Sequence, residues 1–530
     1  MKYDSIFTWQ LALGLLLLLS FSQHNYVYSR YGGRILLHDS VTLMRGTDMM
    51  EYEKAIIHDG LLIYPNGFGF QVYSIILKNL FNIDYTYLFN YFYNIQGIFL
   101  VPIYFVFIRE FVNDDKIAVF GTLLLNVQPD FFFVTFRATH ERFFIMAFML
   151  FVLSLKRSFY IACQTEMKKM IILAYIFITT MLAMNIFIAN SVFTTVFFSM
   201  ILGLTSYSFR VFKKSFLRLI YVSMICLILS FYFIFFLYSP AKVYLKNIKT
   251  LLHKSELLLF GMEQKKSFTE TFPQYQYVTN QYKDPWIFMV LRLFDWIIIP
   301  ISFIAVIFLT RDFVRHSLRD THLEHLVLLL FLYYGFILQF AFSIFFDRIG
   351  VLGRNTELRL FPYVHIVSIP FFSLFFFARY KALSPSKRKF LFLMISVFIL
   401  VSCVFAMLKT SNDTRVTYKR YFYSEAEQMA VHHSLSKPHG IWPVSRLSYI
   451  LRGQVRANNT DLLLPRSFNK VMIMTSDEDA ISMHYAGINA TYFYYSHWRV
   501  HDADRIYDSD EAALHIVFFK YWQYNDLRRF

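Results

Sequence analysis

The sequence contains very little cysteine. Its three cysteines, Cys163, Cys226 and Cys403, lie in or beside apolar segments, and their spacing matches neither a disulfide framework nor a zinc site. This excludes a tail held together by disulfides and a zinc site built on cysteine.

The chain also lacks the motifs of several common classes of protein. It has no glycine-rich phosphate loop and no Ser-His-Asp or Cys-His signature of a catalytic nucleophile. No nucleic-acid-binding motif accompanies the net charge of +16. No internal repeat of the kind found in secondary transporters is visible.

Apolar residues are abundant instead. Of the 530 residues, 56% are hydrophobic and 20% aromatic, and the mean hydropathy is +0.42, which is more than one soluble core absorbs. Apolar runs of bilayer length occur at 6–22, 86–108, 116–136, 141–156, 170–186, 187–209, 218–238, 287–310, 322–346, 357–378 and 389–408. They predict an all-α polytopic membrane bundle of about eleven transmembrane helices. No small-x-small cleavage site follows the first run, which favours an uncleaved helix over a signal peptide.

The Lys and Arg residues indicate the orientation of this bundle. They gather in the short loops at 156–169, 210–218, 311–319 and 379–389, and basic short loops are typical of the cytoplasmic side. The prediction is a multi-pass protein of the cell membrane with a cytoplasmic N-terminus. The segments that then lie outside are 23–85, 137–140, 239–286, 347–356 and the tail. Residues 67–81 are apolar but short and carry Lys78, so we expect a helix in the outer interface.

The chain changes character at Lys409. Residues 1–408 form the predicted membrane domain, and in 409–530 the segments VMIMTS, TYFYYS and ALHIVFFK alternate with a helical stretch, SEAEQMAVHHSL. This pattern predicts a small extracytoplasmic α/β domain. Glycosylation sequons at Asn412, Asn458 and Asn489 fit that location, although such short motifs also arise by chance.

Charged residues in the outer loops are the candidates for chemistry. In the first loop, Asp48, Glu51 and Glu53 begin an amphipathic helix that ends near Gly60. Carboxylates at a membrane surface can serve as a base or hold a metal. The same acids would also suit the first turn of a solvated helix, where they complement the helix dipole.

The second outer loop is very short and carries Arg137, His140 and Glu141. These charged side chains suit either a functional site or an ion pair at the membrane interface. A third group of basic residues lies at the outer entrance of the tenth predicted span and comprises Arg348, Arg354 and Arg359. Arginine forks suit phosphate oxygens, and arginines near helix ends also snorkel to the interface. Within the eighth predicted span, the i, i+3 spacing of Arg292 and Asp295 predicts that they pair with each other.

The first loop resembles that of a known family. An acid at Asp48, a short helix, Gly60, Tyr64-Pro65 and an interfacial helix to Leu77 follow one another as in the GT-C superfamily of membrane glycosyltransferases. The acidic second loop is similar as well. That superfamily includes protein O-mannosyltransferases, lipid A aminoarabinose transferases and the catalytic subunit of oligosaccharyltransferase. The resemblance covers the architecture of residues 1–408 and a few motif positions.

The resemblance implies an inverting glycosyltransferase that uses a polyprenyl-phosphate-linked sugar donor and a lipid, glycan or protein acceptor, among membrane lipids and without nucleic acid. It implies catalytic roles for Asp48 and Glu141, which would also be the ligands of a divalent metal, Mg or Mn, if one is used. The substrate-binding residues that it implies are Glu51, Arg137, His140, Arg354 and Arg359.

Two departures from the family pattern limit these roles. The first loop has no Asp-x-Asp, which leaves metal dependence open, and the tail has no WWDYG motif, which argues against an oligosaccharyltransferase. Two other classes of function stay open beside the enzyme. A polytopic transporter or lipid flippase would show broken helices and repeats, and a non-catalytic scaffold would present the tail to partners.

Overall fold

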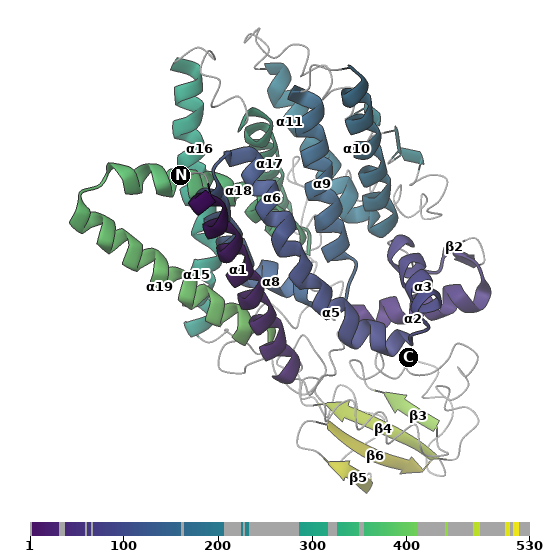
Figure 1. Cartoon of the computed structure of the whole chain (residues 1–530). Helices are drawn as coiled ribbons and strands as arrows, with labels where there is room; N and C mark the ends of the chain where they lie inside the picture. The colour runs from purple at the N-terminus through teal and green to yellow at the C-terminus, as the bar shows by residue number, and fades with distance from the viewer. Residues whose placement is uncertain are drawn as a thin grey trace, which may run out of the picture.

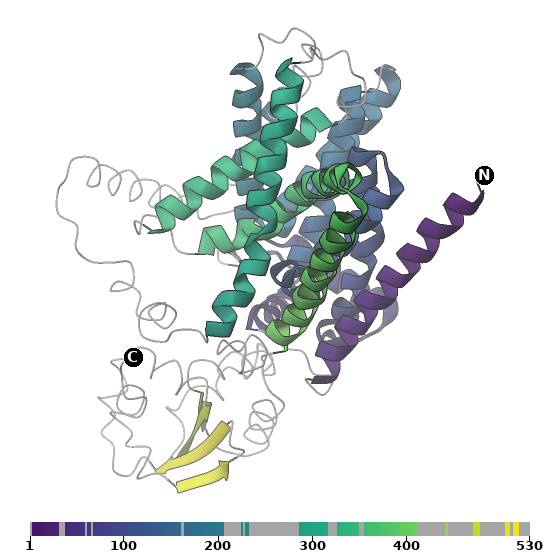
Figure 2. The same ribbon diagram turned by 90° about the vertical axis from the view of Figure 1, so that its left-hand side faces the viewer.

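The structure is a computed structural model. It describes residues 3–30, 38–58, 61–64, 67–160, 164–205, 224–225, 228–229, 231–232, 286–315, 326–348, 355–411, 440–443, 470–476, 504–508 and 512–518. Helices dominate this part of the chain (Figure 1), and most of them run side by side as a bundle (Figure 2).

The first half of the bundle begins with a long helix and two shorter helices of the first loop. Its elements are α1 (Tyr3–Arg30), α2 (His38–Glu53), α3 (Gly69–Phe81), α4 (Tyr85–Tyr87), the π-helix η1 (Leu88–Phe92), α5 (Tyr93–Gln96), the 3-10 helix η2 (Gly97–Phe99), α6 (Leu100–Val112), α7 (Asp115–Asn126), α8 (Pro129–Phe136) and α9 (Glu141–Tyr160). The later helices are α10 (Gln164–Met184), α11 (Ile186–Thr205), α15 (Trp286–Trp296), α16 (Ile298–Arg315), α17 (Val327–Arg348), α18 (Asn355–Ala382) and α19 (Pro385–Thr410).

Six described helical segments are long and apolar enough to cross a membrane, or seven if one bent pair counts as a span. They are Tyr85–Val112, Thr165–Met184, Val290–Arg311, Val327–Ile344, Leu360–Ala382 and Pro385–Thr410. An all-helical polytopic membrane fold is therefore confirmed. The full number of eleven spans stays a prediction, since the described residues give six or seven candidates and most of 218–238 lies outside them.

The predicted span at 116–136 is not one straight helix. It consists of α7 and α8, which meet at a bend of 74°. Pro129 begins α8, and Gln128 before it is extended. Proline has no N–H to donate and disfavours helical geometry in the residue before it, which explains the break. The bend turns α8 away from the direction of α7.

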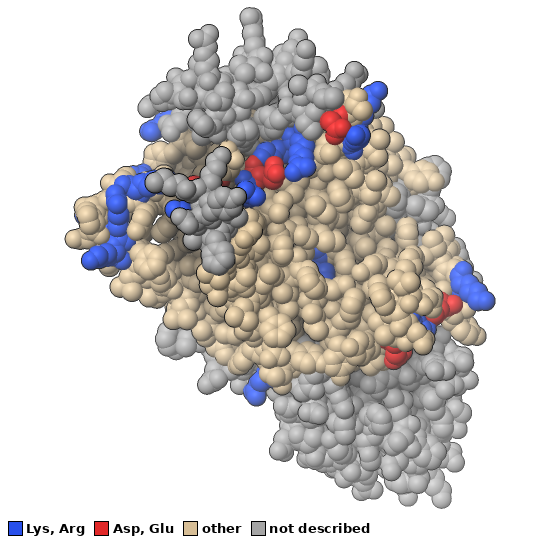
Figure 3. All heavy atoms as spheres, viewed as in Figure 1, with Lys and Arg blue, Asp and Glu red and all other residues tan. Residues whose placement is uncertain are grey.

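The outer surface of the helices is largely apolar. In Figure 3 the described surface is mostly tan, with acidic and basic side chains gathered toward its edges. Leucines and phenylalanines that are more than half exposed occur on several helices, including Leu18, Phe99, Leu293 and Leu400. A surface of this kind suits hydrocarbon, because lipid tails replace water as its solvent.

The helices also approach one another closely in places. A Cβ built on Gly335 of α17 would lie 2.4 Å from Ser199 Oγ and 2.6 Å from the Thr195 carbonyl oxygen of α11. The neighbouring Thr195 hydroxyl donates to the Gln339 side chain. Small residues and hydrogen bonds between helices are the contacts that hold helices together in lipid, where apolar burial gives little net gain.

The described part of the tail contains four strands. They are β3 (Gly440–Pro443), β4 (Lys470–Ser476), β5 (Asp504–Asp508) and β6 (Ala512–Phe518), in the sheet order β3-β4-β6-β5. β3 and β4 are parallel, whereas β6 is antiparallel to both β4 and β5. Strands at VMIMTS and ALHIVFFK are confirmed. The segments TYFYYS and SEAEQMAVHHSL lie outside the described residues, and the domain boundary at Lys409 stays a prediction.

Helix α3 covers the predicted interfacial segment 67–81. Its 13 residues span only about 20 Å, which is less than the hydrocarbon core of a bilayer. Asn82 ends the helix in a left-handed conformation, and the backbone N–H of Asn82 donates to the Lys78 carbonyl. Near it, α2 and a small antiparallel pair, β1 (Ile57–His58) and β2 (Leu61–Leu62), complete the described first loop. These dimensions favour a helix that lies on the membrane.

This placement predicts that both flanks of α3 face the same side of the membrane. Single cysteines at Tyr52 and Asp84, both exposed, would be introduced into a chain whose native cysteines are replaced by serine. We expect an impermeant maleimide to label both positions in intact cells. A cysteine at the exposed Lys168 is the control and should react only after permeabilisation. Protection of either Tyr52→Cys or Asp84→Cys would show that α3 crosses.

Candidate active site

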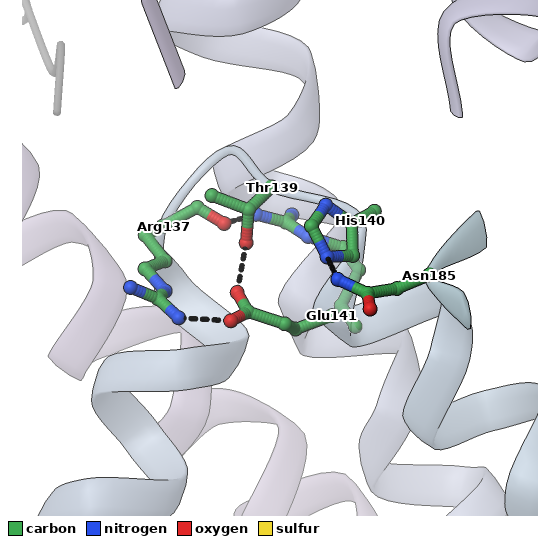
Figure 4. A network of polar contacts seen from close by, with 6 residues as sticks. Arg137, Thr139, His140, Glu141 and Asn185 are labelled. Atoms are coloured by element: carbon green, nitrogen blue, oxygen red, sulfur yellow. Dashed lines mark hydrogen bonds and ion pairs between the residues drawn. The ribbon is translucent and has the colours of Figure 1, made fainter. Parts of the chain in front are cut away.

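The second loop holds Glu141 in a fixed position (Figure 4). Arg137 forms an ion pair with Oε1 of Glu141, and the Thr139 hydroxyl donates to Oε2 at 2.5 Å. The backbone N–H of Thr139 donates to the Arg137 carbonyl at 2.8 Å, which folds the loop tightly. The Arg137 and Glu141 side chains are only 14% and 13% exposed. Both carboxylate oxygens of Glu141 are thus oriented by neighbours within its own loop.

His140 is buried beside this pair. Its Nε2 lies 2.6 Å from the side-chain nitrogen of Asn185, which precedes α11. The Asn185 side-chain oxygen accepts the backbone N–H of Ile188 at 3.1 Å, so its NH2 group faces the imidazole. Nε2 must then accept this hydrogen bond, and the ring is neutral with its proton on Nδ1. The loop therefore presents a neutral histidine as a donor at Nδ1.

Arg142, the second residue of α9, was missed by the sequence reasoning. Its side chain is completely enclosed, and one guanidinium nitrogen donates to the carbonyls of Phe136 and Arg137 at the end of α8. Carbonyls at a helix C-terminus attract cations. A charged residue directly after Glu141 in a long apolar helix was the available signal.

The first loop contributes a second polar cluster. Oε2 of Glu51 on α2 accepts hydrogen bonds from Lys78 of α3 at 2.5 Å and from the Tyr85 hydroxyl at 2.8 Å. Asp48 is half-buried one turn earlier on α2, and both acids act electrostatically on Tyr85. Lys78 and Tyr85 were not among the expected site residues, because their approach to Glu51 depends on the packing of α2 against α3.

The two loops are joined by packing. Leu43 and Met44 of α2 share one hydrophobic cluster with Phe70 of α3 and with Ala138 of the second loop. The His140 ring lies between the first-loop residues Tyr64 and Phe70, with ring centroids 6.4 and 6.5 Å away. The structure therefore brings the first and second loops together, as a shared site requires.

The structure does not place the side chains of the third predicted group, the arginines near the tenth predicted span. Arg354 lies outside the described residues, and Arg348 and Arg359 belong to α17 and α18 by their backbone only. The expected pair of Arg292 with Asp295 is wrong. The Asp295 carboxylate instead lies 3.9 Å from Lys409 Nζ, because α19 packs against α15 and places a lysine in the same buried space.

The described residues do not form a metal-binding set. In that part of the chain, no three His, Cys, Asp or Glu side chains come close enough together to hold an ion. Glu141, one of the two expected ligands, uses both oxygens for Arg137 and Thr139.

Of the comparisons with known proteins, the comparison with solved structures gives matches. No protein-family model matches the chain, and no curated protein matches its sequence. In structure the chain is similar to ArnT from Cupriavidus metallidurans bound to undecaprenyl phosphate, with 10% identity and a TM-score of 0.40. It is similar also to the apo state of the same protein, with 10% identity and a TM-score of 0.41. Each match covers 95% of this chain and 98% of the ArnT chain.

Proposed function

We propose that the chain is a membrane glycosyltransferase. It transfers a sugar from a polyprenyl-phosphate-linked donor to an acceptor at the outer face of the membrane, with its N-terminus in the cytoplasm. The observation that carries this proposal is the packing of two acidic loops against each other, one with Asp48 and one with Glu141, both predicted to lie on the outer side of the helical bundle. The order of Asp48, Gly60 and Tyr64-Pro65 resembles the GT-C first loop and supports the same conclusion.

The chemistry requires a base and a positive environment. An acceptor hydroxyl attacks the anomeric carbon of the sugar, its proton moves to a carboxylate, and the lipid phosphate leaves with the bonding electrons. Asp48 is half-buried on a helix of the first loop and is assigned as the base. If attack and departure occur in one step, the anomeric configuration inverts.

The charged residues of the second loop, Arg137 and Glu141, are held in fixed positions and support this reaction electrostatically. Arg137 carries a planar guanidinium, whose geometry suits phosphate oxygens. Glu141 holds this guanidinium in place through their ion pair, and we assign the guanidinium to the donor phosphate. Side chains that are already held in place lose little conformational entropy when the charged substrate binds.

The proposal predicts release of polyprenyl phosphate when donor and acceptor are supplied together. The full chain in nanodiscs would be given undecaprenyl-phosphate sugars, with a membrane extract as acceptor, and the released undecaprenyl phosphate would be measured. Glu141→Gln removes the charge that holds Arg137, and we expect turnover to fall at least about tenfold. Recovery at high Mg would assign Glu141 a ligand role as well.

The matched control is Glu166→Gln. Glu166 is half-exposed on α10 and pairs with Lys169 at 2.7 Å, on the side predicted to be cytoplasmic. This variant should keep the parental turnover. If no donor in the panel releases lipid phosphate, or if Glu141→Gln behaves like Glu166→Gln, the proposed function is wrong.

One observation favours a second candidate, a transporter. The 74° break between α7 and α8 is the kind of discontinuous helix that lines transport sites. A transporter would move the lipid or its headgroup between leaflets and leave the sugar–phosphate bond intact. Movement of labelled undecaprenyl-phosphate sugar across proteoliposomes without bond cleavage would support this candidate.

A further inference from the structure

Arg142 is a buried cation whose hydrogen-bonding capacity is largely unused. Its side chain is 2% exposed, and its contacts with the carbonyls of Phe136 and Arg137 involve Nη2 alone. Nε and Nη1 have no hydrogen-bond partner. Among the described residues no carboxylate lies within ion-pair distance of it; Glu141 acts on it electrostatically but pairs directly with Arg137 and Thr139. A buried charge in this state costs several kcal/mol unless something compensates it.

Two buried tyrosine hydroxyls near Arg142 also have no hydrogen-bond partner. Tyr104 of α6 is 1% exposed and Tyr363 of α18 is 2% exposed, and neither hydroxyl has a hydrogen-bond partner. Tyr104 interacts electrostatically with Arg142 and with Tyr363, and Glu141 and Arg137 act electrostatically on Tyr363. The Tyr363 ring also packs on α9, with centroids 5.7 Å from Phe144 and 5.4 Å from Phe148. The helices α6, α9 and α18 thus bring three buried groups with unpartnered donors into electrostatic range of one another.

We propose that Arg142, Tyr104 and Tyr363 form an internal binding site for a phosphate oxyanion. Every unused group of the set can donate, and the set includes one permanent positive charge. Water could satisfy the two hydroxyls but would leave the guanidinium charge without a counterion. An anion satisfies all three residues together, and the planar Nε and Nη1 edge of arginine suits two oxygens of one phosphate.

The site deepens the proposed function, on which it rests for its expected source of phosphate. A polyprenyl phosphate would bring its headgroup from the bilayer, and inorganic phosphate would carry the same chemistry from water. The site would then be the anion-binding part of the second loop, in the role that the sequence resemblance assigned to Arg354 or Arg359. Binding can be measured without sugar transfer, so the two proposals can fail separately.

The experiment measures binding to the full chain in nanodiscs. The probes are undecaprenyl phosphate, the uncharged alcohol undecaprenol and inorganic phosphate, followed by native mass spectrometry. Tyr104→Phe and Tyr363→Phe delete only hydroxyls that have no partner, so neither should lower thermal stability. Each should weaken phosphate binding about tenfold. Arg142→Lys keeps the charge but loses the planar fork, and should weaken binding about 10- to 100-fold.

Arg157→Met is the matched control, since Arg157 lies on the same helix, is 54% exposed and pairs with Glu110 at 3.1 Å. It should bind like the parent. Binding of undecaprenyl phosphate but not undecaprenol supports a lipid headgroup, and equal binding of inorganic phosphate supports the site with an aqueous source. The proposal is overturned if neither phosphate binds, or if the Arg142 and tyrosine variants bind like Arg157→Met. Intact binding in a chain that transfers no sugar would overturn the proposed function and leave the phosphate site standing.

Discussion

Replacing Asp48 with asparagine should lower sugar-transfer turnover by about 10²–10⁴-fold. The substitution keeps the size of the side chain and its capacity for hydrogen bonds, but an amide cannot take the proton of the acceptor hydroxyl. Since the donor phosphate is bound by cations elsewhere, the affinity for donor should change little. Initial rates and donor binding would be measured on the same preparation in nanodiscs.

Asp84→Asn is the control for this prediction. Asp84 is exposed before α4 and makes no capping hydrogen bond through its side chain, so its loss should leave turnover unchanged. Transfer by Asp48→Asn at the parental rate would remove Asp48 from the reaction. A parallel loss of donor binding would instead make Asp48 a binding residue, because a pure base acts only in the transition state.

The membrane architecture was predictable because it is a local property of the sequence. The apolar runs at 357–378 and 389–408 correspond to α18 and α19, whose termini extend a few residues further. Strands β4 and β6 were recognisable from alternation and from β-branched residues. In each case the residues that decide the structure lie next to one another in the chain.

The break between α7 and α8 also has a local cause in the sequence, Pro129. The hydropathy of the surrounding apolar run does not reveal it. Hydropathy measures whether a segment suits lipid, and it does not register a missing N–H group. A proline in the middle of an apolar run should therefore be tested as a possible end of the helix before the run is counted as one span.

The contacts of the candidate site also divide into those that follow from local spacing and those that depend on the packing of distant segments. Arg137 and Glu141 are four residues apart, and their pairing follows from local spacing. Asn185 and Lys78 reach His140 and Glu51 only through the packing of separate helices. Burial of Arg142 is likewise a tertiary property, so that no spacing rule could distinguish it from an arginine in a solvated loop.

Lys409 illustrates the same limit and leads to the largest expected effect on stability. Its amine is ion-paired with Asp130, at the start of α8 and 279 residues away, and lies 3.9 Å from Asp295 of α15. Lys409 is 7% exposed and Asp295 is 1% exposed, and neither Asp295 oxygen has a hydrogen-bond partner. His365 contacts the Asp295 carbonyl at 2.9 Å and extends the cluster to α18.

Lys409→Met would leave two carboxylates in this space without their shared cation. We expect a loss of about 3–5 kcal/mol, because removal of one member of a buried pair exposes the full desolvation cost of the others. Lys169→Met is the control: Lys169 is 61% exposed and pairs with Glu166, and its loss should cost at most about 1 kcal/mol. Thermal midpoints in nanodiscs would rank the two variants.

The combined variant Lys409→Met, Asp130→Asn, Asp295→Asn separates charge from packing. It removes the cation and both anions at nearly constant volume, so most of the lost stability should return. Failure to recover would mean that the lysine stem contributes by packing. A midpoint for Lys409→Met equal to that of Lys169→Met would show that the cluster is solvated. Since Asp130 lies in the first turn of α8, the short helix that ends at Phe136 directly before the second loop, recovery of stability without recovery of turnover would show that this ion pair also positions that loop.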